Sequence, residues 1–493
     1  MSDDEKRAEA FFSLAHKLGT PIEKTAKQLA IEALLLTIEK INLIKVCESL
    51  GWRGNDGDSP SKSNFKVAII HSLIETAKRL NWHVIHDAGF FYIYNGAYWT
   101  ALEDAEVKQL VKEAAIRMGH TEIECRDAKF VDDLFRQCIQ DGFFIERHQK
   151  KKSIINLKNG SLHLTDKGIK LKPFDYRDFL THQLDFNYDE TAQNDIFLKY
   201  LNVVLPNKDT QKTLQQVTGY LFIKGLKLEK MFFLYGTGSN GKSVFFEVLN
   251  GILGEENMSN YSLENLTNDN GYFRAMIKDK IVNYGTDIKL ENIDAGRFKQ
   301  LASGEPIDAR LPYKNPFNIT DYAKLIFNVN KMDSAKVEHT HGFWRRFLFI
   351  PFLVKIEDKD KDKDRDLHKK ILQNRAGVLN WIIEGAKQVI ENRDLFISNE
   401  CEEIKTQFMK ETDTVAMFEE QSIKEHLRGN FYICKVVECY GYYKDYCANA
   451  GYRGVLNRGN FVKRMLAIGF DKFTDREGTI LRKNYAMGSS EKF

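Results

Sequence analysis

Three features are scarce in this 493-residue chain, and each scarcity excludes a class of protein. No uninterrupted apolar stretch approaches the ~20 residues of a membrane-spanning helix, and the polar start has no apolar signal segment. The seven cysteines form no C-x-x-C pair and no cysteine–histidine ligand spacing, so we expect reduced core cysteines in a cytoplasmic protein. The net charge of +3 by itself predicts no nucleic-acid partner.

The composition, 43% hydrophobic and 29% charged, is typical of a soluble globular protein, and the length suggests about three domains. We expect an α/β multi-domain chain, because short apolar runs alternate with helical stretches between residues 229 and 355. Buried strands are expected at 231–235, 280–284, 324–329 and 347–352. The expected parts are a helical segment at 1–60, an α+β domain at 61–228, a parallel-sheet core at 229–355, a helical linker at 356–427 and a small C-terminal domain at 428–493.

The most informative pattern is G-x-x-x-x-G-K-[ST] at residues 236–243, between an expected strand and an expected helix. In that context the glycines let backbone N–H groups converge on phosphate oxygens at the positive end of the helix. We therefore predict a nucleoside triphosphate site, with ATP favoured, in which Lys242 reaches the β/γ-phosphates and Ser243 offers its hydroxyl to Mg²⁺. The expected nucleotide contacts are Gly236, Thr237, Gly238, Ser239, Asn240, Gly241, Lys242 and Ser243.

Further candidates for catalysis stand next to the other expected strands. Asp287 follows 280–284 and is expected to bind Mg²⁺ or activate water, the alternative being a surface aspartate in a turn. Asn330 ends 324–329 and is expected to sense the γ-phosphate, although a lone asparagine there is more often a turn former. Arg345 and Arg346 precede 347–352, and at least one is expected to stabilise charge on the transferred phosphate rather than form a surface salt bridge.

With loop, acid, asparagine and paired arginines in this order, the chain resembles superfamily 3 helicases. The resemblance is to the helicase portion of phage and plasmid primase–helicases, with poxvirus-type relatives, and its core covers about residues 228–352. The stretches 92–99 and 155–160 look like the N-terminal region of the same family. The resemblance implies an AAA+-like core and a homo-oligomeric ring, expected to be a hexamer, in which Arg345 or Arg346 reaches the neighbouring subunit's site.

The segment 308–317 resembles the β-hairpin that projects into the central pore of this family. Lys314 matches the lysine that grips the nucleic-acid backbone there, with Arg310 and Tyr313 beside it, and an ordinary exposed hairpin is the alternative. The implied activity is ATP-dependent translocation on single-stranded DNA, which unwinds forked duplex during replication of a phage, plasmid or mobile element.

The chain departs from the family in two respects. Asp287 stands alone where relatives have glutamate or an acidic pair, which leaves open whether it binds metal, activates water or both, and whether Glu291 assists. No strand with paired metal-binding aspartates precedes residue 80, and Asp132 and Asp133 lie in a helical pattern typical of a solvated face. If the system primes DNA, a separate primase or polymerase is therefore an expected partner.

The C-terminal part predicts a helix at 431–443, a second, basic helix at 457–466, and short strands around Phe473 and at 480–485. Helix, helix and wing is the pattern of a winged-helix domain, which binds DNA or docks proteins. The candidate DNA contacts in this part are Arg458, Lys463, Arg464, Arg482 and Lys483.

Two other functions stay open at this point. One is a nucleotide-switch ATPase, such as a replication initiator or a defence scaffold, that assembles on DNA without unwinding it. The other is an ATPase that acts on proteins, which Lys314 and the basic C-terminus disfavour. A forked-duplex unwinding assay separates the helicase from the first, and DNA-stimulated hydrolysis separates it from the second.

Overall fold

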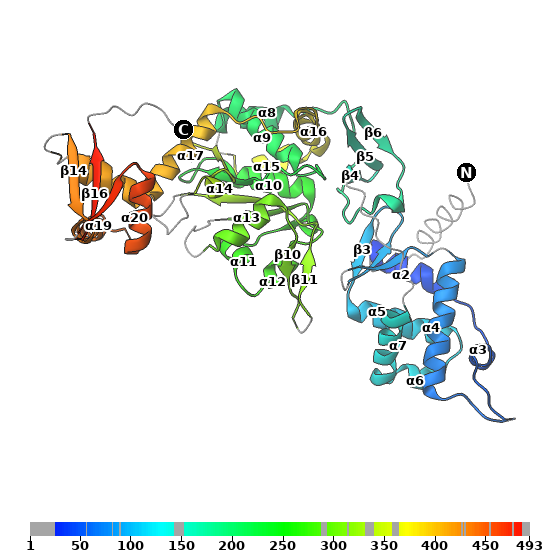
Figure 1. The fold of residues 1–493 in the computed structure, drawn as a ribbon. Coiled ribbons are helices and arrows are strands. Elements are labelled where there is room, and N and C mark those ends of the chain that lie inside the picture. Colours follow the sequence, from blue (N-terminus) through cyan, green and yellow to red (C-terminus); the bar gives the residue numbers. More distant parts are fainter. Residues whose placement is uncertain are drawn as a thin grey trace. The chain divides into compact units, whose positions relative to one another are not determined.

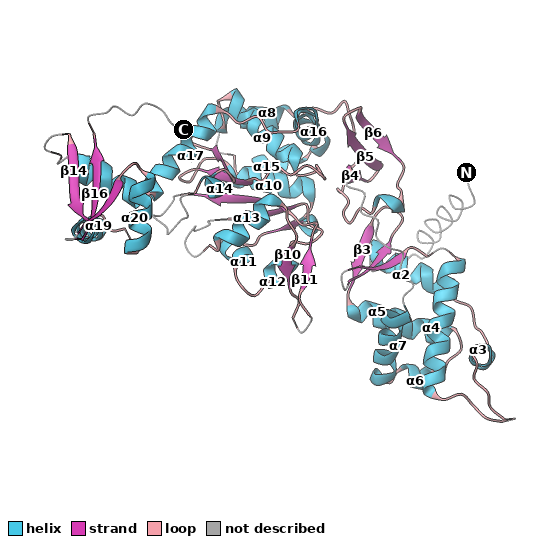
Figure 2. Ribbon diagram, viewed as in Figure 1, coloured by secondary structure: helices cyan, strands magenta, loops and turns pink. Residues whose placement is uncertain are grey.

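The computed structural model describes residues 25–55, 57–80, 82–87, 90–141, 152–286, 293–312, 315–330, 340–356, 364–424, 427, 430–452, 455–475 and 478–485. The chain divides into two compact units, one ending at Tyr188 and one beginning at Asp189. Both units mix helices with strands (Figures 1 and 2), which confirms the predicted α/β multi-domain class. Within these ranges, no helix combines the length and the apolar character that crossing a membrane requires.

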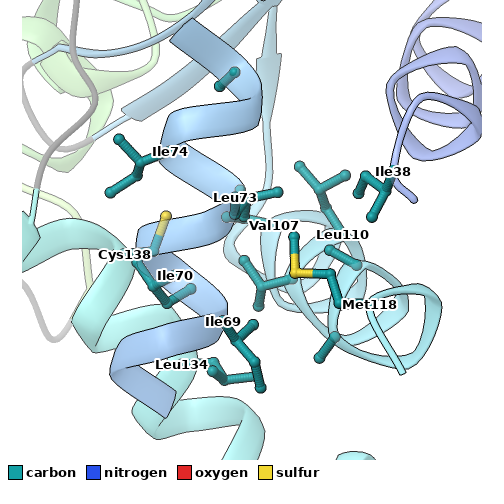
Figure 3. Packing of buried hydrophobic residues seen from close by; sticks show 14 of the residues in the cluster. Ile38, Ile69, Ile70, Leu73, Ile74, Val107, Leu110, Met118, Leu134 and Cys138 are labelled. Carbon is teal, nitrogen blue, oxygen red and sulfur yellow. The ribbon is translucent and has the colours of Figure 1, made fainter. Parts of the chain in front are cut away.

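The first unit has a helical core. In α4, Ser61 caps the helix by accepting a hydrogen bond from the backbone N–H of Asn64, and buried residues recur every three or four positions. Figure 3 shows Ile70 of α4 packed with Cys138 of α7 in the same cluster as Val107 of α5. The helices of this unit are α2 Ala26–Leu36, α3 Leu43–Ser49, α4 Lys62–Arg79, α5 Asp104–Arg117, α6 Glu122–Cys125 and α7 Ala128–Asp141.

Two antiparallel sheets complete this unit, in the orders β1-β2-β3 and β4-β5-β6. Asn95 forms the turn between β2 and β3, where its side-chain oxygen accepts hydrogen bonds from the backbone of Ala97 and Tyr98. The side-chain nitrogen of Asn156 in β4 donates to the carbonyl of Ala97 at 3.0 Å and so ties the second sheet to this turn. The strands are β1 Val84–Asp87, β2 Phe90–Tyr94, β3 Trp99–Leu102, β4 Ser153–Leu157, β5 Gly160–Thr165 and β6 Gly168–Lys172, followed by the short helix η1 Tyr176–Asp178.

The second unit contains a parallel sheet of five strands in the order β13-β7-β12-β9-β8. Its central strands are buried along nearly their whole length because helices cover both faces (Figure 1). The four expected strands are present, with small shifts of their ends, and β8 is an additional one. The strands are β7 Met231–Tyr235, β8 Met258–Ser259, β9 Val282–Gly285, β12 Lys324–Val329 and β13 Phe347–Pro351.

The two faces of this sheet pack against different helices. On one face Phe233 stacks on Phe347 in a cluster that includes Phe408 of α17. On the other face Phe232 contacts Tyr220 of α9. The helices around the sheet are α8 Asp195–Val204, α9 Lys208–Tyr220, α10 Lys242–Leu253, η2 Glu255–Asn257, α11 Leu263–Thr267, α12 Tyr272–Ala275, α13 Ala295–Ser303, α14 His341–Trp344, α15 Leu367–Leu372, α16 Arg375–Asn392 and α17 Asn399–Thr412.

The last part of the unit forms a small antiparallel sheet in the order β14-β16-β15, with two helices against one face. The predicted helix at 431–443 is wrong over its first five residues, which form β14 and pair with β16. Alternating exposure along this segment is typical of a strand, and the helix starts only at Val436. The elements are α18 Thr414–Phe418, the π-helix η3 Glu419–Lys424, β14 Phe431–Lys435, α19 Val436–Asn449, α20 Arg458–Ala467, β15 Asp471–Asp475 and β16 Gly478–Asn484.

Candidate nucleotide site and nucleic-acid contacts

The predicted phosphate loop connects β7 to α10 at the carboxyl edge of the parallel sheet. Its first backbone N–H, from Gly236, donates to the carbonyl of Val329 at 3.0 Å, which joins the loop to the end of β12. Positive φ angles of 104° at Gly238 and 87° at Gly241 turn the backbone, a conformation that suits glycine. The loop therefore leads directly into the 12-residue helix α10, whose first residue is Lys242.

Lys242 is held inside the loop. Its side chain is buried, and its Nζ donates to the carbonyl of Gly236 at 2.6 Å and to Asn240 Oδ1 at 3.0 Å. Asn240 in turn donates from Nδ2 to the carbonyl of Phe352 at 2.7 Å, just beyond β13. Asn240 thus links the loop and its lysine to a neighbouring strand end, a role that the sequence pattern did not predict.

Two of the glycines are required by close packing. A Cβ added to Gly236 would lie 1.9 Å from Asn240 Nδ2 and 2.3 Å from the carbonyl oxygen of Phe352. A Cβ added to Gly241 would lie 2.5 Å from a methyl group of Val204 in α8. Neither position has room for a side chain, so this glycine pattern has a structural basis at both ends of the loop.

Tyr200 of α8 forms a hydrogen bond to the loop residue that directly precedes α10. Its hydroxyl donates to the carbonyl of Gly241 at 2.9 Å. Burial, together with nearby Tyr284, raises the pKa of Tyr200, so the hydroxyl stays protonated and remains a donor. Nothing in the local pattern indicated this residue, which lies about 40 positions before the loop.

The residues present fit a triphosphate with a metal ion. Thr237, Gly238, Ser239 and Ser243 are exposed, while Lys242 lies beneath them at the N-terminus of α10. Backbone N–H groups, a helix N-terminus and a fixed cation are the donors that phosphates require. Within the described ranges no three acidic, histidine or cysteine side chains gather as metal ligands.

The structure places one of the two predicted strand-end partners. Asn330 is exposed directly after β12, and the last residue of β12, Val329, pairs with Tyr235 at the end of β7. Asn330 therefore follows the strand next to the loop, at the same edge of the sheet. Asp287 and Glu291 lie outside the described residues, and β9, which precedes them, ends at the same edge with Gly285.

The paired arginines lie at the opposite edge of this sheet. They precede β13, whose first residue pairs with the first residue of β7, and the backbone N–H of Met231 donates to the carbonyl of Arg346 at 2.8 Å. The six residue steps from Arg346 to Phe352, beside the loop, span about 20 Å. An arginine side chain cannot cover that length, so neither arginine reaches the phosphate loop of its own chain.

The two arginine side chains have different surroundings. Arg345 is 42% exposed and forms an ion pair with Glu229. Arg346 is only 12% exposed, donates to Ser303 Oγ at 3.0 Å and to the carbonyl of Gly342, and lies 3.6 Å from Glu229. Arg345 can move once its ion pair with Glu229 breaks, whereas Arg346 is held by several partners in its own chain.

The predicted hairpin at 308–317 is present as the strands β10 Ile307–Ala309 and β11 Phe317–Ile319. Arg310 is exposed at the start of its tip, while Tyr313 and Lys314 lie outside the described residues. The base of the hairpin is anchored by Arg274 of α12, which is fully buried. Its Nη2 pairs with Asp308 Oδ2 at 2.5 Å and its Nε donates to the carbonyl of Asp308 at 2.6 Å.

The basic C-terminal candidates fall into two groups. Arg458 and Lys463 of α20 and Arg482 of β16 are exposed. The other two candidates form ion pairs within the fold. Arg464 pairs with Asp413 at 2.5 Å, and Lys483 pairs with Glu419 at 2.7 Å. Both acids are almost fully buried, so these two cations secure the C-terminal elements to α17, α18 and η3. The DNA contacts expected of all five stay predictions.

Residues 71–206 match the family described as D5 N terminal like, and residues 234–346 match a family of unknown function, DUF5906. A protein of Acanthamoeba polyphaga mimivirus named "Putative helicase" is 25% identical over 272 residues, which are 51% of this chain and 27% of that protein. This chain thus spans about a quarter of the length of that relative. The D5-like match and this relative support a relationship to helicase-like proteins of the primase–helicase type.

Solved structures of the NrS-1 C-terminal region are also similar. The A form of its apo structure has a TM-score of 0.46 at 11% identity and covers 84% of this chain and 99% of that chain. A second apo structure has a TM-score of 0.45 at 12% identity, with coverages of 85% and 99%.

Proposed function

We propose that this protein is an ATP-dependent DNA helicase of the superfamily 3 type that works as a ring, expected to be a hexamer. The observation that carries the proposal is the position of the two halves of the site on one sheet. The phosphate loop with buried Lys242 lies at the carboxyl edge, and Arg345 lies at the amino edge about 20 Å away. A complete site then needs the loop of one subunit and the arginine of its neighbour.

The chain's own residues have separate tasks in this proposal. Lys242 and the loop N–H groups bind and orient the phosphates, and Ser243 holds Mg²⁺, which when bound neutralises phosphate charge. Asn330 positions the attacking water next to the loop, and Asp287 activates it. Arg345, rather than Arg346, stabilises the charge that develops on the transferred phosphate, because its one carboxylate partner and its exposure allow it to reach across a subunit boundary.

The hairpin and the C-terminal part supply the DNA contacts. Lys314, with Arg310 and Tyr313, would grip the backbone of single-stranded DNA, which needs charge and stacking but no base-specific readout. The hairpin base is rigid, since the guanidinium of Arg274 makes four hydrogen bonds to backbone and carboxylate oxygens around it. The relative named as a helicase and the D5-like match support a helicase-like DNA function, without bearing on these contacts.

The deciding experiment measures phosphate release and unwinding of a forked duplex by the purified chain. Lys242→Ala should abolish hydrolysis, and Lys314→Ala should keep basal hydrolysis but lose unwinding. Lys199→Ala, which changes an exposed lysine on α8, is the matched control and should behave like the parent protein. Full unwinding by Lys314→Ala would remove the hairpin from the mechanism, and ATP-dependent assembly on DNA without strand separation would favour a nucleotide-switch scaffold.

A further inference from the structure

The outward face of the C-terminal sheet carries large apolar side chains. The other face of this sheet packs on α19 and α20 around the fully buried Leu481 (Figure 2). On the outward face Phe431, Ile433 and Phe473 are 61%, 64% and 54% exposed. Side chains of this size and kind are usually buried, so a group of them on one face marks a binding surface.

The strand register places these side chains around one cation. Ile433 of β14 lies opposite Arg482 of the central strand, and Ile480, two positions earlier on that strand, lies opposite Phe473 of β15. The guanidinium carbon of Arg482 is 4.3 Å from the centre of the Phe473 ring. This is a cation–π contact at the surface, and Phe473 remains 54% exposed.

The spacing of the two rings suits an extended ligand. Phe431 lies opposite Asn484 and Phe473 opposite Ile480, so the rings are two strands apart across the sheet and four residues apart along it. With ordinary strand spacings this separation is roughly 17 Å. One planar group cannot touch both rings, but successive groups of a flexible chain can, and Arg482 lies between them.

We propose that this face binds single-stranded nucleic acid by stacking separate bases on Phe431 and Phe473 while Arg482 pairs with the phosphate backbone between them. Exposed rings combined with arginine are the chemistry of sequence-tolerant strand binding. Among the side chains of this face that the structure describes, Lys435 adds a second cation, and the acid Asp471 already faces Arg482 at 3.7 Å. Exposed rings beside a guanidinium favour an anionic chain of planar groups over an apolar protein segment. The inference rests on the proposed function only for its choice of DNA as the polymer.

This surface differs from the wing expected from the sequence. Lys483 alternates to the inner side of the sheet, where it donates to Glu419 and to the carbonyl of Ile468. Phe431 could not be placed on this face from the sequence, because the local pattern of its segment predicts a helix. The pairing of β14 with β16 is what brings Phe431 onto the same face as Arg482.

The test measures binding of a fluorescent oligothymidylate to the full chain by anisotropy, with no nucleotide present. The double variant Phe431→Ala/Phe473→Ala should weaken binding about 5-fold or more, because stacking on one ring contributes at least that much. An oligonucleotide of the same length with abasic sites should bind parent and double variant equally. Tyr442→Ala, which removes a ring that is 59% exposed on α19, is the control and should bind like the parent.

A second readout does not depend on total affinity, since other parts of the chain are also expected to bind DNA. An oligonucleotide containing 5-iododeoxyuridine should crosslink under ultraviolet light to peptides containing Phe431 or Phe473, and the double variant should lose these crosslinks. Unchanged affinity together with unchanged crosslinking overturns the proposal, as does an equal loss of affinity for the abasic strand. A protein partner on this face would give the first of these results. Because no ATP is present, the outcome is independent of whether the protein unwinds DNA.

Discussion

Replacing Arg345 with alanine should remove nearly all ATP hydrolysis without unfolding the protein. Its ion pair with Glu229 joins side chains that are 42% and 37% exposed, so losing it should change the free energy of unfolding by about 0–1 kcal/mol. An arginine supplied by a neighbouring subunit contributes about 10³–10⁵ to kcat in related chemistry. Arg346→Ala should instead lower the free energy of unfolding by roughly 2 kcal/mol, because it removes half-buried charged hydrogen bonds to Ser303 and Gly342.

Mixing two inactive variants tests whether the site is shared between chains. Lys242→Ala keeps an intact arginine edge, and Arg345→Ala keeps an intact loop. In the proposed ring each site forms at a junction between two subunits, one supplying the loop and the other the arginine. In an equal mixture both parts are intact at about one junction in four. We therefore expect the mixture to hydrolyse ATP at about a quarter of the parent rate, measured as phosphate released in the presence of single-stranded DNA.

Two results would refute this reasoning. A mixture no more active than the separate variants means that loop and arginine do not combine across chains. Parent-level hydrolysis by Arg345→Ala alone means that this arginine has no part in the reaction. A mixture of the double variant Lys242→Ala/Arg345→Ala with the parent protein is the control for subunit exchange, since activity should fall from about half to about a quarter of the parent rate when the chains mix.

Two further predictions concern stability. Burial, followed by the nearby charge of Lys224, lowers the pKa of Lys324 to about 7, so the folded protein binds fewer protons than the unfolded chain above that pH. The contribution of Lys324 to the free energy of unfolding should therefore rise from about pH 7 towards pH 10. Urea titrations of Lys324→Met should lack this rise. The same dependence of unfolding free energy on pH in the parent and the variant would disprove the prediction. Asp413→Ala should cost roughly 3 kcal/mol because it strands Arg464, and limited proteolysis should then cut the C-terminal elements first, whereas unchanged protection would contradict this.

The phosphate loop and its edge of the sheet could be predicted because their signals are local. A strand, a glycine pattern and a helix are contiguous in the sequence, and the order of the later strand ends follows from parallel topology. The supports of the loop could not be predicted, since Tyr200 and Phe352 reach it only through tertiary contacts. The different surroundings of the two arginines are likewise set by Ser303 and Glu229, which are far from them in sequence.

The C-terminal part shows where local pattern is ambiguous. The five residues of β14 are apolar and aromatic, and so short a run is compatible with a helix or a strand. The segment forms a strand because it pairs with β16, which lies about 50 residues later in the chain. For the same reason a count of basic residues could not separate exposed Arg482 from Arg464, whose partner Asp413 lies in a different element.

The arginine edge also has a direct connection to the hairpin. Arg346 donates to Ser303 Oγ, and Ser303 is the last residue of α13, only four positions before β10 begins. Ser303 is buried, so in the proposed ring a displacement of Arg346 would move the segment from which the hairpin emerges. If this contact transmits the motion, Ser303→Ala should leave the rate of hydrolysis near the parent value while fewer base pairs are unwound per ATP. We expect a decrease of about 2- to 30-fold, the range for residues that carry coupling between sites.

Thr406→Ala is the matched control, because this exposed hydroxyl donates to the backbone of its own helix, at Glu402. A Ser303→Ala protein that unwinds as many base pairs per ATP as the parent would show that the hairpin moves by another route.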